Sequence, residues 1–430
     1  MQDSSPQQKP AHGDHPLRGT VLGEVHSRPF QPLTSPAQLL HFAFMTDAAQ
    51  AAADRQAVAK LCGENGAPGP APGAKHHFVR LGELGFRWEQ HSEFTTTTFV
   101  VEGAAGASFD KARLLCAPLI ARLPQAGPLL VSATLALEAE AGAEPLERIL
   151  DAGSLVASVI GRGAAVAATD FRLAPDGFVH ILMRVRDLSP NRAGAMAQRL
   201  LELETYRTLS LLGLPEAQRC GPRIKRVEDA LDAILREMNV ATDPPADHRL
   251  LDELTALAAE LEADVAASSY RFGASRAYDE LVQQRLSTLG EENFGDYSTF
   301  QSFLARRMTP AMRTCRIVAE RQLDLSEKLG RAANLLRTRV DVEIERQNRD
   351  LLHSMNERTR LQLRLQQTVE GLSVAAISYY IIGLLGYVFK GARELGYGPE
   401  PGVATAAAVP LVVLGVALIV KRIRGAHGEQ

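Results

Sequence analysis

The sequence predicts an α+β protein: an N-terminal, mainly antiparallel sheet with helices, then an all-α region with a very long stalk helix leading into a C-terminal two-helix transmembrane hairpin. Three observations predict this fold class. β-Branched and aromatic residues concentrate before Pro190, which favours strands there. After Pro190, apolar residues recur at helical spacing. Two apolar spans without a charged residue lie near the C-terminus, as expected for membrane helices.

A chain of 430 residues is longer than one typical domain. The expected segments are a disordered tail (1–20), a cytoplasmic α+β domain (21–189), a helical region (190–309), a long stalk helix (310–370), a first transmembrane helix (371–389), a short loop (390–401), a second transmembrane helix (402–420) and a basic cytoplasmic tail (421–430).

The α+β domain is expected to begin with a helix over residues 35–62. Ser35 would be its N-cap and Pro36 its first residue. The stretch 76–103 is rich in aromatic and β-branched residues with turn residues between them, so it predicts two or three strands.

A second helix is expected over residues 108–123, followed by a strand within 128–139. Further strands are expected within 155–185, where Pro175, Asp176 and Gly177 mark a hairpin turn.

The helical half begins at Pro190, and helices are expected over 190–213, 222–239, 246–289 and 298–308. A continuous helix from Ala311 to Phe389 would then be about 120 Å long. Its apolar stripe and mixed charges are typical of a coiled coil, which predicts a homo-oligomer. Amide side chains interrupt the stripe, and they would either set the register of the oligomer or line a hydrated path.

The two apolar spans have roughly 18–19 residues each, near the lower limit for crossing a bilayer core of about 30 Å. Lys and Arg are more frequent outside the hairpin than in its loop. This bias predicts that both termini are cytoplasmic. The N-terminal segment lacks the apolar stretch of a secretory signal.

Composition excludes several classes of partner. The formal net charge of −3 argues against a nucleic-acid partner. The four cysteines are far apart without a CxxC pair, which argues against a zinc knuckle or a disulfide framework. Motifs of the P-loop, HExxH and GxSxG types are absent, and GRGAAVAATD (161–170) lacks the dinucleotide-binding spacing. No cofactor and no catalytic residue are therefore predicted.

Polar residues in and beside the first span are candidates for a pore or for helix packing. They are Glu370, Ser373, Ser378, Tyr379, Tyr380 and Gly383. The tyrosine and serine hydroxyls would line a pore or form interhelical hydrogen bonds within an oligomer. Glu370 would form an ion-attracting ring, or it is an interfacial charge close to Arg364.

A compact polar cluster follows Trp88. Glu89, His91 and Glu93 alternate along a predicted strand, so they would share one face. Such residues could bind a divalent cation or perform acid–base chemistry, and the alternative is an exposed face with a salt-bridge network.

Three N-terminal residues, Glu24, His26 and Arg28, alternate in the same manner. This pattern suggests a docking loop against the face that carries Glu89.

Several long strings carry a family resemblance: GEVHSRPF (23–30), RWEQHSEFTTTTF (87–99), ELETYRTLSLLGLP (202–215), RRMTPAMRTC (306–315) and the segment 347–380. They resemble an uncharacterised family of bacterial, predicted membrane-anchored proteins, over nearly the whole chain. The resemblance implies the same architecture and a multi-pass location in the bacterial inner membrane. It implies no activity.

The architecture alone is similar to that of CorA-type magnesium channels, which share the order of cytosolic domain, long helix, short loop and second span. The Gly-Met-Asn motif that marks those channels is absent, because Gly386–Tyr387–Val388–Phe389–Lys390 stands in its place. This departure puts magnesium selectivity in doubt.

Three functional hypotheses follow. The first is a membrane-anchored, homo-oligomeric protein with a structural or regulatory role. The second is a CorA-like ion channel or transporter, and the third is a membrane-tethered enzyme that uses Glu89, His91 and Glu93.

Overall fold

The protein is described by a computed structural model that covers residues 15–18, 21–22, 29–104, 106, 110–240 and 244–427. Most of the predicted tail over 1–20 lies outside these residues. The chain forms two compact units. Unit 1 contains residues 1–236 and 254–331, and unit 2 contains residues 237–253 and 332–430.

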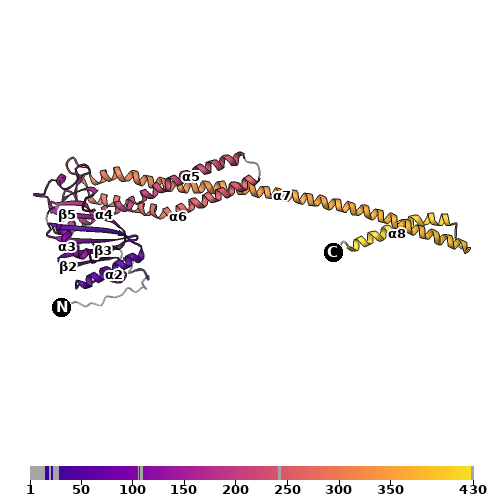
Figure 1. The fold of residues 1–430 in the computed structure, drawn as a ribbon, viewed down its shortest axis with the longest axis horizontal. Helices are drawn as coiled ribbons and strands as arrows, with labels where there is room; N and C mark the ends of the chain where they lie inside the picture. Colours follow the sequence, from indigo (N-terminus) through magenta and orange to yellow (C-terminus); the bar gives the residue numbers. More distant parts are fainter. Residues whose placement is uncertain are drawn as a thin grey trace. The chain divides into compact units, whose positions relative to one another are not determined.

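The predicted fold class is confirmed, since a sheet-containing region precedes a helical region with one very long helix and a C-terminal helix (Figure 1). The strands are β1 (Ala37–Met45), β2 (His76–Leu81), β3 (Leu84–Gln90), β4 (Phe94–Glu102), β5 (Leu129–Ala139), β6 (Val156–Ile160), β7 (Ala165–Leu173), β8 (Val179–Val185) and β9 (Glu292–Asn293). The helices are α2 (Ala48–Glu64), α3 (Asp110–Ile120), a 3₁₀ turn η1 (Leu146–Arg148), α4 (Pro190–Leu211), α5 (Gly213–Val240), α6 (Pro244–Leu289), α7 (Phe300–Glu394) and α8 (Pro401–His427).

The described strands form one sheet in the order β2-β3-β4-β1-β5-β8-β7-β6-β9. All neighbouring strands pair antiparallel except β5 and β8, which are parallel. The prediction of a mainly antiparallel sheet is therefore confirmed. The predicted turn at 175–177 joins β7 to β8, and Gly177 adopts the left-handed φ of 84° that such a turn favours.

The prediction of one helix over residues 35–62 is wrong. Residues 37–45 form β1, and the helix that follows, α2, begins only at Ala48. β1 lies inside the sheet between β4 and β5. Cores form on both faces of the sheet, so apolar residues occupy consecutive positions of β1, and only Gln38 and His41 interrupt the apolar run. Such a short run cannot be distinguished from a helix by periodicity. At the true helix start, the Asp47 side chain accepts a hydrogen bond from the backbone N–H of Gln50. The Gln50 side chain accepts one from the backbone N–H of Asp47, which completes a capping box.

Helices cover both faces of the sheet in unit 1 (Figure 1). One core contains β1 and β5 residues together with α4, the C-terminal part of α6 and the start of α7. The opposite core contains β2, β3 and β4 residues with α2 and α3. Along β1 the alternation places Leu39 in the first core and Leu40 in the second, as the pleat of a strand requires.

The helical half departs from the prediction at two proline positions. The expected helix over 222–239 begins earlier, because α5 starts at Gly213 and includes Pro222. The expected boundary between 298–308 and a stalk starting at Pro310 is absent, because α7 runs through Pro310. Proline weakens a helix without always ending it.

Unit 2 contains the C-terminal part of α7 and all of α8. The 95-residue helix α7 is unbroken, so the predicted very long helix is confirmed. Figure 1 shows α8 beside the end of α7. There a Cβ built on Gly386 would lie 3.9 Å from Thr405 Oγ1 of α8.

Candidate functional site

The predicted polar cluster does not form one strand face. β3 ends at Gln90, and His91 and Glu93 lie in the turn before β4. The prediction that the three residues alternate along one strand is therefore wrong. The structure also does not unite them into a cation site: no group of three or more His, Cys, Asp or Glu that could hold a metal occurs among the described residues.

Each carboxylate of this cluster is instead held by an arginine. Glu89 accepts a hydrogen bond from Arg87 at 2.7 Å, and both side chains are largely buried. Glu93 accepts two hydrogen bonds from Arg271 of α6, at 3.0 and 2.6 Å. The His91 ring stacks on Phe94 with the ring centroids 4.1 Å apart. The cluster thus ties the β3–β4 hairpin to α6.

The Arg87–Glu89 pair continues into a polar chain across α4. Arg87 donates to Gln198 at 2.8 Å, and Gln198 donates to Glu202 at 2.7 Å. Glu202 also accepts a hydrogen bond of 2.5 Å from Arg285 of α6. This chain links the sheet, α4 and α6 within unit 1, and polar networks of this kind help to specify how elements pack.

A small cavity of about 50 Å³ adjoins this chain between the sheet and α4. Its lining includes His41, Arg87 and Glu89, and Arg87 Nε has no hydrogen-bond partner among the described residues. Burial, together with the positive charge of Arg87, lowers the pKa of His41 to about 3. Space of this size holds a few water molecules, so it is too small for an organic substrate.

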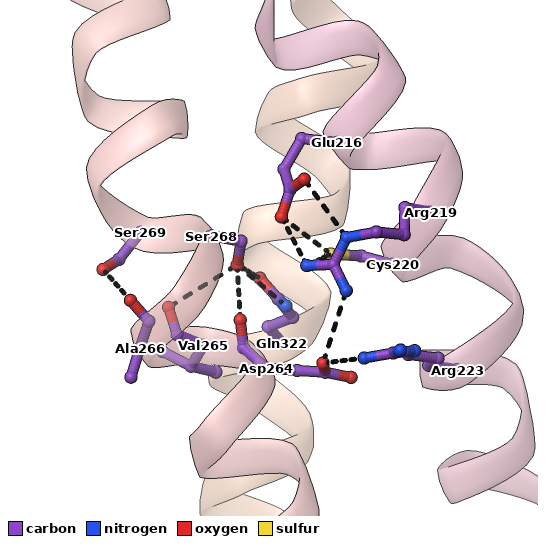
Figure 2. A network of polar contacts seen from close by, with 10 residues as sticks. All are labelled: Glu216, Arg219, Cys220, Arg223, Asp264, Val265, Ala266, Ser268, Ser269 and Gln322. Carbon is purple, nitrogen blue, oxygen red and sulfur yellow. Dashed lines mark hydrogen bonds and ion pairs between the residues drawn. The ribbon is translucent and has the colours of Figure 1, made fainter.

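A second polar network joins the three helices α5, α6 and α7 (Figure 2). Asp264 of α6 forms ion pairs with Arg223 and, at 3.7 Å, with Arg219 of α5. One turn further along α6, Ser268 is hydrogen-bonded to Gln322 of α7 at 3.2 Å. These contacts fix the relative rotation of the three helices in unit 1.

The four cysteines are free and buried. Burial raises the pKa of each thiol, that of Cys116 to about 12. A thiolate for metal binding or nucleophilic attack is therefore disfavoured at all four positions.

The candidates in the first span have different environments. Ser378 is buried, and its hydroxyl has no hydrogen-bond partner among the described residues. Tyr379 and Tyr380 are 77% and 72% exposed. The Ser373 hydroxyl donates to the Val369 carbonyl at 2.8 Å. The two tyrosine side chains are therefore not covered by the described part of the chain.

Two further candidates in this region are partly or fully accessible. Glu370 is half-buried. A Cβ added at Gly383 would meet no atom within 4 Å, so Gly383 does not mediate a close helix contact within the chain. The roles of these residues in a pore or in oligomer packing remain predictions. The proposed docking loop of Glu24, His26 and Arg28 lies outside the described residues.

A cationic pocket was not predicted from the sequence. Arg162, Arg192 and Arg199 line an open pocket of about 640 Å³ in unit 1, together with residues such as Phe30 and Met196. None of its described lining residues is acidic. Arg162 belongs to the Gly161–Arg162–Gly163 turn, in a segment that was set aside because it lacks the dinucleotide-binding spacing. The sequence signal that could have pointed to this pocket is the turn itself, where an arginine stands between two glycines.

The chain was compared with known proteins. A family model described as "Protein of unknown function (DUF3422)" matches residues 13–427. No curated protein and no solved structure matches the chain.

Proposed function

Because the chain belongs to this family of proteins of unknown function (DUF3422), its role must be inferred from its own geometry, and we propose that it is a membrane-anchored protein with a structural or regulatory role. α7 and α8 anchor it in the bacterial inner membrane, and unit 1 and both termini lie in the cytoplasm. Copies assemble through α7 into a homo-oligomer.

One observation carries the anchoring. Both α7 and α8 contain an apolar window long enough to cross a membrane, and only 6% of each window is buried. The core helix of a soluble protein would have most of such a window covered. Exposed residues such as Leu384, Leu411 and Leu418 would instead contact lipid.

Alkaline carbonate extraction of membranes tests the anchor on the full chain. The wild-type protein is expected to remain in the membrane pellet and to dissolve only in detergent. The double variant Leu384→Lys/Val413→Lys should shift to the soluble fraction or be degraded, because each lysine costs about 2.5–3.5 kcal/mol at the centre of a span.

A matched control carries the same charges outside the spans. Leu352 and Leu363 are exposed on α7 before the first span, and their replacement by lysine should leave the protein in the pellet. Release of the wild type by carbonate alone would rule out the anchor. The orientation is tested with Tyr397→Cys, between α7 and α8, which should react with an impermeant maleimide added from the periplasmic side.

The assembly is supported by an apolar stripe on α7 that is buried at its N-terminal end and exposed to solvent further along the helix. In unit 2, Leu336 and Val340 are buried, whereas Ile344, Leu351 and Met355 are about half exposed. Arg358 and Gln362 hold the next two seam positions, and apolar residues return at Leu365 and Val369. The heptad spacing of a coiled-coil seam is kept, with polar interruptions. A second copy is the partner that fits, because copies anchored in one membrane present the same stripe in parallel and at the same height.

A CorA-like channel or transporter that lacks the Gly-Met-Asn motif is the second candidate. It is favoured by the direct passage of α7 into the first apolar window and by the short connection between Glu394 and Pro401. Cation flux into liposomes that contain the full chain tests it. Flux that disappears in Tyr379→Phe/Tyr380→Phe would support a path lined by tyrosine hydroxyls, and absence of flux from a homogeneous oligomer would leave the anchor alone.

A further inference from the structure

The cationic pocket of unit 1 has no acidic residue in its described lining. Arg162 and Arg192 are exposed and Arg199 is half-buried. Elsewhere in unit 1, Arg184 is neutralised by Glu138 at 2.9 Å and Arg271 by Glu93 at 2.6 Å. Arg162 and Arg199 form no ion pair or hydrogen bond with a described residue. Like charges that share a pocket repel one another, so an anion bound between them would relieve this repulsion.

The backbone of the β6–β7 turn places Arg162 in this pocket. Gly161, Arg162 and Gly163 all adopt left-handed conformations, with φ of 65°, 60° and 85°. A left-handed conformation is costly for a residue with a side chain, and such strain concentrates at functional sites. Arg192 Nη2 donates to the Gly161 carbonyl at 3.1 Å, which ties the turn to the first turn of α4.

The pocket offers more than charge. Its volume of about 640 Å³ far exceeds that of a phosphate ion and falls in the range of small-molecule sites, about 300–1,000 Å³. Phe30, which lines the pocket, is 49% exposed, and Met196 and Leu289 supply buried apolar surface. An aromatic ring beside arginines is the combination that stacks a base and holds phosphate groups.

We propose that this pocket binds a nucleoside polyphosphate. The guanidinium groups of Arg162, Arg192 and Arg199 contact the phosphate oxygens, and the Phe30 ring packs against the base. The proposal is independent of the membrane anchor, because every residue it uses belongs to unit 1.

Isothermal titration calorimetry of the full chain in phosphatidylcholine nanodiscs tests the proposal. The probes are ATP, inorganic pyrophosphate and adenosine. ATP is expected to bind more tightly than pyrophosphate, and adenosine should bind least. Phosphatidylcholine has no net charge, so these nanodiscs contain no anionic lipid headgroup. A binding heat would therefore come from the soluble probe.

Two variants assign the binding to the pocket. Arg162→Asn/Arg199→Gln should weaken ATP and pyrophosphate binding by about 100-fold, since charge-assisted hydrogen bonds are lost. Asparagine tolerates the left-handed conformation at 162, so the turn is preserved. Phe30→Ala should weaken ATP binding about tenfold and leave pyrophosphate binding unchanged.

The control Lys111→Ala/Arg236→Ala removes two exposed positive charges elsewhere in unit 1 and should bind ATP like the wild type. Equal loss in this control would show non-specific attraction and overturn the site. ATP binding that survives Arg162→Asn/Arg199→Gln, or no binding by the wild type, would also overturn it. Equal affinity for ATP and pyrophosphate would exclude a nucleotide as the ligand.

Discussion

His41 is buried in the middle of β1, and both of its ring nitrogens are hydrogen-bonded to threonines. Nδ1 lies 2.8 Å from Thr98 Oγ1 of β4, and Nε2 lies 3.0 Å from Thr205 Oγ1 of α4. A neutral ring satisfies both contacts. Burial and the nearby charge of Arg87 lower the pKa of His41 from 6.5 to about 3, so the folded protein resists protonation of this ring.

This shift predicts a pH dependence of stability. The folded pKa lies below the unfolded value, so the stabilisation is fully present above about pH 6.5 and is lost as the pH falls towards 3. The free energy of unfolding should drop by up to about 1.4 kcal/mol per pH unit in this window through His41 alone. Denaturant unfolding at pH 7 and pH 5 measures it, and His41→Gln should flatten the dependence.

The exposed His353 on α7 provides the control. His353→Gln should keep the wild-type dependence on pH. Identical slopes for wild type and His41→Gln would show that His41 is protonated in the folded protein at mild acidity.

Gly194 allows α4 to approach the chain before β1. A Cβ at this position would lie 1.8 Å from the Gln31 carbonyl oxygen. Relief of this clash would require a backbone shift of α4 or of the segment around Gln31. Gly194→Ala is expected to lower the free energy of unfolding by about 1–3 kcal/mol or more, as overpacking does. Chemical denaturation of the full chain measures the change.

Gly273 is the matched control, because it is also inside a helix and a Cβ there meets no atom within 4 Å. Gly273→Ala should raise the free energy of unfolding by about 0.5–1 kcal/mol. A loss of stability in both variants would mean that close packing does not explain the requirement at Gly194.

At the residue scale, a salt-bridge network was one of the alternatives predicted for Glu89 and Glu93, but the sequence did not identify the arginines that pair with them. Arg271, which holds Glu93, is 178 residues away in the chain. A single sequence shows spacing along one strand or helix and carries no information about such a distant contact. The cationic pocket was missed for the same reason, because its arginines come from a turn and from α4.

At the element scale, α7 passes through Pro310 without ending. Proline lacks the N–H that would bond to the Arg306 carbonyl, and a proline inside a helix costs about 3 kcal/mol. Pro310→Ala is expected to raise the free energy of unfolding by up to this amount. Thermal or chemical denaturation of the full chain in detergent measures the gain.

Pro190 is the control for this substitution. It is the first residue of α4, where proline suits the helix and no hydrogen bond is lost. Pro190→Ala should therefore give no gain. If Pro310→Ala is destabilising, the bend or packing at Pro310 is needed by the fold.

Elements were predictable where one physical signal dominated. The strands within 76–103 and 155–185 were visible because turn residues separate β-branched runs, and the long helix was visible because glycine is absent from 331–370. β1 was missed because a strand covered on both faces loses the alternation that identifies a strand. The predicted first residues of α5 and α7 were placed too late, because neighbouring helices stabilise helical turns that proline disfavours.

At the scale of the whole molecule, the exposed stripe on α7 predicts self-association. Leu351→Glu/Met355→Glu places charges on the stripe, at positions 59% and 56% exposed in the single chain. The variant should keep the wild-type fold and lower the association constant at least tenfold, about 1.4 kcal/mol. Mass photometry or light scattering in detergent measures the mass.

The control His353→Glu/Gln367→Glu adds the same charges on the opposite side of the helix. Its oligomeric mass should equal that of the wild type. A wild-type monomer, or a mass that Leu351→Glu/Met355→Glu leaves unchanged, would contradict assembly through the stripe.

The order of the units along the chain has a consequence for biosynthesis. Unit 1 is complete at Arg331, after β9 has added the last strand to the sheet, and the first apolar span begins only near Gly371. At about 5–20 residues per second, the ribosome needs about 2–8 s for the intervening stretch. The sheet and the cores on its two faces can therefore close before the first apolar span is synthesised. If the spans insert into a membrane as proposed, folding of unit 1 and membrane targeting follow one another in time.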